Sequence, residues 1–210
     1  MDELKSMLEK KQYDEALDLL AKSQGELSAD SYLYNRGLIF EKKNNLIKAR
    51  LNYEKAQNLG LRDQKLDQSL NRVYENLGVS YLEEARSFAH HFIQSSLDIP
   101  ISFALFAFLL ILVSCIYLGK SLKKLTRVFL LIVLVIPFIY GSYIRLNYSY
   151  ALANGDVALR LGPSHSMERI IDLPSGLKVI VKKKTQRGWT EVYFPEEFKG
   201  WVQNNQFLLY

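Results

Sequence analysis

The stretch IPISFALFAFLLILVSCIYLG, residues 99–119, contains no charged side chain. A second uncharged stretch, VFLLIVLVIPFIYGSYI, follows at residues 128–144. At about 1.5 Å of rise per residue, the first would span roughly 31 Å as a helix, close to the thickness of a hydrocarbon core. The second would span roughly 25 Å and would need a thinner bilayer or flanking arginines that reach the interface. We therefore predict two transmembrane helices, 99–119 and 128–147, that form a hairpin.

The short connection between these stretches sets the expected orientation. Residues 120–127, KSLKKLTR, contain four basic residues and no acidic one, and the positive-inside rule places such a loop in the cytoplasm. Both flanking parts would then be periplasmic, on a two-pass protein of a bacterial inner membrane. The alternative orientation, with both parts in the cytoplasm, stays open because no cleavable signal peptide is visible at the N-terminus. Two helices buried in a soluble domain would need a large protein shell, which 210 residues do not supply.

Composition excludes several classes of function. The formal net charge of +5 owes much to the loop at 120–127, so it does not predict nucleic-acid binding. The single cysteine, Cys115, allows neither an internal disulfide nor a zinc site. Neither apolar stretch contains Asp, Glu, His, Lys or Arg, which favours an anchor over a transporter. No catalytic, cofactor-binding or metal-binding constellation is visible, so we expect no cofactor and no enzyme activity.

Residues 1–98 have a helical composition, without proline, and a self-similarity of about 34 residues. The clearest unit, 30–63, reads Leu33-x2-Arg36-Gly37-x2-Phe40, then Ala49-x3-Tyr53-x2-Ala56. It resembles a tetratricopeptide repeat (TPR), with Arg36 and Leu61 departing from the usual pattern. We predict TPR-like repeats over 1–80 and an amphipathic capping or juxtamembrane helix over 81–98, although a generic helical bundle would show similar spacing. The predicted repeat core consists of Gly37, Phe40, Ala49, Tyr53 and Ala56.

A stack of such repeats usually binds a peptide or protein in the groove formed by the first helix of each unit. We therefore expect the binding residues on those helices, where a solvated face is the plain alternative. The candidates are Tyr34, Leu38, Glu41, Gln68, Arg72 and Glu75.

After residue 154 the pattern changes to short β-branched and aromatic runs separated by turn residues. The order VALRLGPS, LPSGLKVIV, RGWTEVYF, KGWVQ resembles a bacterial SH3-like (SH3b) domain, which we predict over 154–210. So small a fold needs large aromatic side chains in its core, and we expect Trp201 there. Trp189 and Tyr193 are equally compatible with the core and with a peptide-binding groove, and all three are groove candidates.

The predicted fold class is a multi-domain membrane protein with all-α TPR-like repeats, a two-helix transmembrane hairpin and a small all-β SH3-like barrel. This order resembles the BatE-type proteins of the bacterial aerotolerance (Bat) family. The resemblance implies membrane partners, namely von Willebrand A-domain proteins and a MoxR-type ATPase system. The leading hypothesis is a non-catalytic scaffold that assembles a membrane complex. The alternative is a cell-wall sensor or anchor that binds peptidoglycan peptides through the SH3-like domain.

Overall fold

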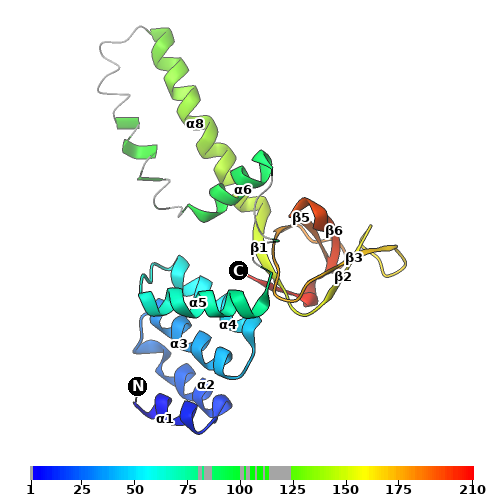
Figure 1. Ribbon diagram of the computed structural model, residues 1–210. Helices are drawn as coiled ribbons and strands as arrows, with labels where there is room; N and C mark the ends of the chain where they lie inside the picture. Colours follow the sequence, from blue (N-terminus) through cyan, green and yellow to red (C-terminus); the bar gives the residue numbers. More distant parts are fainter. Residues whose placement is uncertain are drawn as a thin grey trace.

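The computed structural model of this chain has helices in its N-terminal part and an antiparallel sheet in its C-terminal part (Figure 1). Among the elements whose bounds the described residues define, helices α6 (Phe88–Asp98) and α8 (Lys124–Asn147) lie between these parts in the sequence. The structure describes residues 2–79, 82, 87–99, 102, 105–106, 108–110, 112–113 and 124–210.

Polar residues cap the N-termini of two helices in the helical part, and a glycine ends one of them. The Asn45 side chain accepts a hydrogen bond from the Lys48 backbone N–H, and Asp63 does the same for Lys65, so both satisfy first-turn N–H groups that have no helical partner. Gly78 ends the last of these helices with a left-handed φ of +66°. The elements are α1 (Asp2–Glu9), α2 (Tyr13–Lys22), η1 (Ser23–Gly25), α3 (Ala29–Lys42), α4 (Leu46–Asn58) and α5 (Gln64–Leu77).

Helices α3 and α4 approach closely because Gly37 lacks a side chain. A Cβ added to Gly37 would lie 2.5 Å from two ring carbons of Tyr53, much closer than a van der Waals contact. Tyr53 and Ala49 have no exposed surface, and Phe40 is also buried in the same cluster. Helix α5 completes the cluster with Leu66, Leu70 and Val73.

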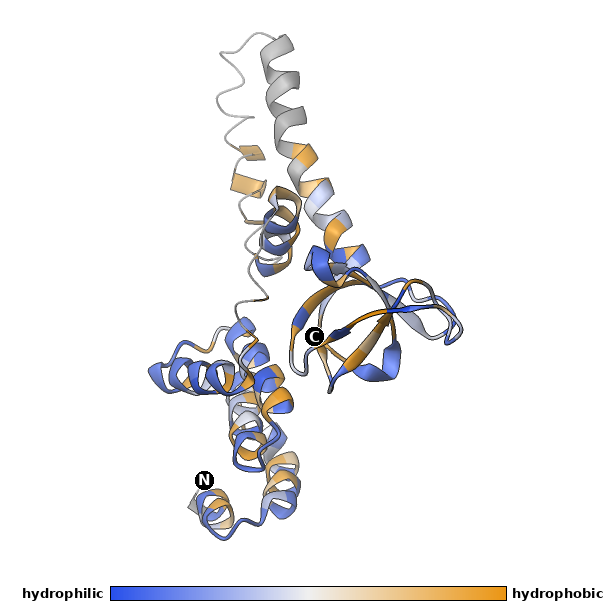
Figure 2. Ribbon diagram, turned by 45° about the vertical axis from the view of Figure 1, so that its right-hand side comes forward, coloured by the Kyte–Doolittle hydropathy of each residue, from blue (hydrophilic) through white to orange (hydrophobic). Residues whose placement is uncertain are grey.

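Seven antiparallel strands form one sheet in the order β3-β2-β6-β5-β4-β1-β7. The sheet curls round a common centre, and its apolar stretches are orange in Figure 2. Inward side chains alternate with outward ones, as in β6, where Val202 is buried between the partly exposed Trp201 and Gln203. The strands are β1 (Tyr148–Ala153), β2 (Val157–Arg160), β3 (Arg169–Leu173), β4 (Lys178–Lys182), β5 (Trp189–Phe194), β6 (Gly200–Gln203) and β7 (Phe207–Leu209), with short 3-10 turns η3 (Glu196–Phe198) and η4 (Asn204–Gln206).

The two intervening helices pack on the sheet. Helix α8 (Lys124–Asn147) leads directly into β1, and α6 (Phe88–Asp98) lies beside it. Ile144 of α8 is 1% exposed and shares a core cluster with Ile93 of α6 and with Ile180 and Phe194 of the sheet. The C-terminal end of the second apolar stretch is therefore held by protein contacts.

The expected fold class is wrong. In place of separate all-α TPR-like repeats, a transmembrane hairpin and a small SH3-like barrel, the described residues form a mixed fold of short helices and a seven-stranded antiparallel sheet. The physical reason lies in packing between segments that are far apart in the sequence. Strand β1 begins at Tyr148, directly after α8, and pairs with both β4 and β7, so the sheet starts before the predicted boundary at 154.

The expected transmembrane helices and inner-membrane localisation are contradicted as well. Across the described ranges, no helix combines the length and the apolarity that a membrane crossing requires. A continuous apolar run in the sequence does not tell whether protein or lipid covers the helix. The absence of charged residues was therefore not sufficient to predict a membrane span. Most of the first predicted span, 99–119, and residues 120–123 of the loop lie outside the described residues. So do residue 80 of the predicted repeats and residues 81 and 83–86 of the predicted 81–98 helix.

Candidate binding surface

The structure brings three of the predicted groove residues together. Arg72 of α5 donates a hydrogen bond from Nε to Oε1 of Glu41 on α3, at 3.1 Å. The Tyr53 hydroxyl donates to the other Glu41 carboxylate oxygen at 2.5 Å, and the Tyr34 ring lies 5.7 Å from the Tyr53 ring. Glu41 thus links three helices on one face, which we call the α3–α5 surface.

The remaining groove candidates differ in exposure. Leu38 is half-buried against the helical core, whereas Gln68 and Glu75 are exposed on α5. The hydrogen bond with Glu41 raises the pKa of Arg72, which therefore keeps its charge. Burial, followed by the hydrogen bond to Glu41, raises the pKa of Tyr53 far above its usual value, so its hydroxyl stays a donor. The α3–α5 surface consequently offers one half-buried aromatic ring beside charges of both signs.

Phe40, Ala49 and Tyr53 belong to the core cluster that α3, α4 and α5 share, and Gly37 meets the Tyr53 ring where α3 contacts α4. Ala49, Tyr53 and Ala56 have no exposed surface, Phe40 is 8% exposed, and Gly37 is buried. They form the rigid support beneath the α3–α5 surface.

The aromatic residues of β5 and β6 do not lie as expected. Trp201, expected in the core, is partly exposed, because the alternation of β6 turns Val202 inward. Trp189 is buried at 6%, although it shares its strand parity with the partly exposed Tyr193, because the His165 ring packs edge-on against it at 5.1 Å. Tyr193 lies 5.2 Å from the Tyr148 ring.

Sequence reasoning missed a buried ionic cluster that joins α4 to the sheet. Glu54 of α4 is buried, and its carboxylate accepts hydrogen bonds from Arg50 Nε at 2.6 Å, Lys178 Nζ at 2.7 Å and the Tyr210 hydroxyl at 2.6 Å. The Tyr74 hydroxyl donates at 3.2 Å. We call these residues the Glu54 cluster. The only sequence signal is Arg50 and Glu54 at i and i+4, a spacing that is equally typical of a solvated pair.

The electrostatics of the Glu54 cluster favour the ionised carboxylate. Burial by itself would raise the pKa of Glu54, but the charges of Lys178 and Arg50 outweigh it and lower the pKa to about 2. Burial, and then the charge of Glu54, raises the pKa of Tyr210. The cluster is therefore charged and fully hydrogen-bonded at neutral pH.

Further contacts join the helical part to the sheet near the Glu54 cluster, some through the backbone and some between apolar side chains. Arg50 Nη1 donates to the Gly176 carbonyl at 2.9 Å, and Leu77 packs directly over Gly176. Val79, just beyond α5, is buried in the same core cluster as Ala153 and Val179 of the sheet. The helical part and the sheet thus share both a polar and an apolar contact.

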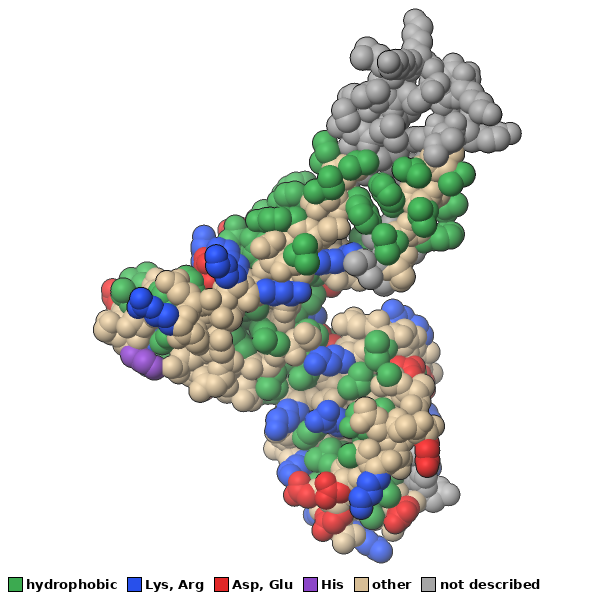
Figure 3. Space-filling view, turned by 180° about the vertical axis from the view of Figure 1, so that it is seen from behind, with side chains coloured by type: hydrophobic (Ala, Val, Ile, Leu, Met, Phe, Trp, Pro, Cys, Tyr) green, Lys and Arg blue, Asp and Glu red, His purple; other side chains and the backbone are tan. Residues whose placement is uncertain are grey.

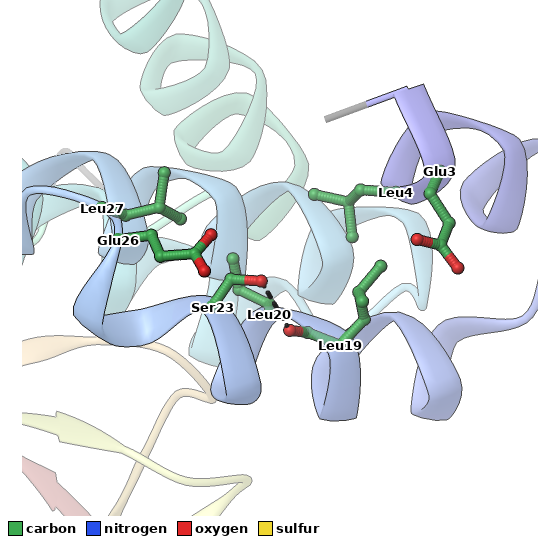
Figure 4. A pocket seen from close by; sticks show the side chains of 7 residues that line it. All are labelled: Glu3, Leu4, Leu19, Leu20, Ser23, Glu26 and Leu27. Atoms are coloured by element: carbon green, nitrogen blue, oxygen red, sulfur yellow. Dashed lines mark hydrogen bonds between the residues drawn. The ribbon is translucent and has the colours of Figure 1, made fainter.

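The structure also contains a cavity and an exposed hydrophobic patch, neither of which groups charged residues as the Glu54 cluster does. A cavity of about 150 Å³ between α1 and α2 is lined largely by leucines, with the Glu3 and Glu26 carboxylates beside them (Figure 4). Hydrophobic side chains gather in the upper part of the molecule, where α6 and α8 expose Phe88, Phe92, Ile136 and Tyr140 (Figure 3). No group of three or more His, Cys, Asp or Glu side chains in the described part of the chain is placed to hold a metal ion.

Comparisons with protein-family models, curated proteins and solved structures find no match to this chain. The resemblance to the aerotolerance proteins therefore stays a prediction that rests on the residues quoted above.

Proposed function

We propose that this protein is a non-catalytic adaptor that binds a peptide or protein partner on the α3–α5 surface. The observation that carries the proposal is the grouping of Tyr34, Glu41 and Arg72 from two separate helices on one face. An aromatic ring and an arginine supported by a rigid core are the side-chain types that dominate binding energy at protein interfaces. Partners such as von Willebrand A-domain proteins belong to the proposal only through the sequence resemblance.

Rigidity supports the same proposal. The helices of the α3–α5 surface share their core with α4, and the Glu54 cluster links α4 to the sheet, so contacts on α4 restrain these helices. A braced surface loses less conformational entropy on binding than a mobile one. The partner we expect carries an acidic group opposite Arg72 and an apolar group against Tyr34.

Site-specific photo-crosslinking tests the adaptor proposal. A photoreactive residue replaces Gln68, which is exposed on α5, or Gln24, which is exposed on η1 and serves as the matched control. We expect a discrete adduct from position 68 and none from position 24. Adding Glu75→Lys, a charge reversal at an exposed site, should strengthen that adduct, because the new positive charge attracts the partner's acidic group, and should leave the melting temperature unchanged. Equal adducts from both positions, or an adduct indifferent to Glu75→Lys, would contradict the proposal.

A second candidate function uses the outer face of β5 and β6. Glu191 pairs in register with Trp201, and Tyr193 shares the outward parity of Glu191, so an acidic group lies between two partly exposed aromatic rings. This arrangement favours the alternative of a peptidoglycan peptide as ligand. A sacculus pull-down with the full chain should retain the protein, and Trp201→Ala should abolish retention. If the Trp201→Ala variant is still retained, the outer face of β5 and β6 is not the binding site.

A further inference from the structure

A polar pocket lies where the ends of α6 and α8 meet β1 and β4. Its cavity measures about 400 Å³, within the range of small-molecule sites, roughly 300 to 1,000 Å³. Asp98 at the end of α6, Arg145 near the end of α8 and Lys183 just after β4 contribute charged groups. Tyr148 and Tyr150 of β1 contribute aromatic walls. We call this the junction pocket.

Two cations of the junction pocket are held by neutral acceptors. Arg145 donates from Nε to the Ser96 carbonyl at 2.9 Å and from a second guanidinium nitrogen to the Ile99 carbonyl. Lys183 Nζ donates to the Arg145 carbonyl at 2.6 Å. Carbonyl oxygens orient these groups but do not neutralise a full positive charge, and each cation carries more donors than these contacts use.

The other charges of the pocket are engaged with one another or with hydroxyls. Lys178, which also lines the cavity, is paired with the Glu54 carboxylate. Asp98 accepts a hydrogen bond from the Tyr150 hydroxyl at 2.7 Å. Burial, and then Asp98, raises the pKa of Tyr150, so that hydroxyl remains a donor. Lys178 shares the Glu54 carboxylate with Arg50, and with these three groups set aside, Arg145 and Lys183 face the single negative charge of Asp98.

We infer that the junction pocket binds a small organic anion. Arg145 and Lys183 hold its carboxylate or phosphate oxygens, and its organic part lies against the rings of Tyr148 and Tyr150. Arg145 is fixed in advance by two carbonyls at the end of α6, which reduces the entropy lost on binding. A planar guanidinium presents paired N–H donors that match both anion types. This inference does not depend on the proposed adaptor function.

Calorimetric titration of the full chain at low ionic strength provides the test. The probes are phenyl phosphate, benzoate and the uncharged benzyl alcohol, which share one ring and differ in the polar group. We expect one or both anions to bind and benzyl alcohol not to bind, and the stronger anion identifies the natural ligand's acidic group. Absence of binding by both anions at millimolar concentration would overturn the inference.

Three substitutions separate a built site from diffuse surface charge. Lys183→Gln should weaken the anion about five- to tenfold by removing one charge-assisted hydrogen bond. Lys184→Gln removes the same charge from the next exposed residue, which does not line the pocket, and should leave affinity unchanged. Asp98→Asn should tighten binding about threefold because it removes the negative charge while keeping an acceptor for Tyr150. Equal effects of the two lysine substitutions, or weaker binding by Asp98→Asn, would refute the inference.

Discussion

Glu54 shows how one residue can join two parts of a chain. Glutamate is rarely buried unless its charge is paired, and Glu54 is paired with Arg50 from its own helix and with Lys178 from β4. Two tyrosine hydroxyls occupy further positions on its oxygens. Such a cluster is costly to break from one side, because the remaining buried charges then lack a partner.

We expect stability to depend on pH through Glu54. Its pKa in the folded protein, about 2, lies below the ordinary value of 4.5. The ionised carboxylate therefore stabilises the fold above pH 4.5, and this stabilisation is lost as the pH falls from 4.5 towards 2. The pKa difference corresponds to about 3 kcal/mol. Urea unfolding measured at several pH values should show this loss.

Glu54→Gln should lower the free energy of unfolding at pH 7 by about 3–5 kcal/mol, because it leaves the buried Arg50 and the partly buried Lys178 without a counter-charge. It should also flatten the pH dependence below pH 4.5. Glu75→Gln, at an exposed position, is the matched control and should keep the wild-type profile. An unchanged slope in the Glu54 variant would show that other carboxyl groups dominate acid unfolding.

At the scale of elements, α3 and α4 pack closely. The small residue Gly37 in the sequence indicates this close packing, and the position of the Tyr53 ring against Gly37 explains it. Gly37 admits the Tyr53 ring, and the same ring positions the hydroxyl that binds Glu41 on the α3–α5 surface. The Tyr53 side chain therefore contributes both to the packing of α3 against α4 and to the α3–α5 surface.

Gly37→Ala should destabilise the protein by about 1–3 kcal/mol, because the new methyl group would overlap the Tyr53 ring. Gly25→Ala is the control: a Cβ there meets nothing within 4 Å, so it should be neutral or slightly stabilising. Thermal melts of the full chain distinguish the two. Equal melting temperatures would mean that α3 and α4 separate easily enough to accept the methyl group.

At the scale of the whole molecule, the Glu54 cluster and the insertion of Val79 make the helical part and the sheet interdependent. The sheet does not complete its core alone, since that core includes Val79 from just beyond α5. Domains with so intimate a contact usually unfold together.

Two spectroscopic probes can follow the two parts separately. Both tryptophans of the chain, Trp189 and Trp201, lie in the sheet, so fluorescence reports on the sheet while circular dichroism at about 222 nm reports mainly on the helices. We expect coincident urea transitions for the wild type. Glu54→Gln should separate them, with one part unfolding first. Transitions that differ already in the wild type would show that the junction does not couple the parts.

Local pattern located much of the secondary structure but not its assembly. Helices occur within 2–77 and strands within 157–209, where helical spacing and β-branched runs indicated them. The same patterns led to the wrong fold class, because an apolar run such as 128–144 does not reveal what covers it. For the candidate binding surface, the sequence placed Glu41 and Arg72 on the first helices of successive repeat units, but it did not place the Tyr53 hydroxyl beside Glu41.

What the sequence by itself determined was therefore local: helix periodicity, the need for a small residue at Gly37, and turn positions between short strands. The tertiary structure alone decided that Glu54 is buried, that Trp189 is covered by His165 while Trp201 stays partly exposed, and that Ile144 packs on the sheet. The physical reason is that burial depends on contacts between residues far apart in the chain. Glu54 and Lys178 are separated by 124 positions, and nothing in the neighbourhood of either one encodes the other.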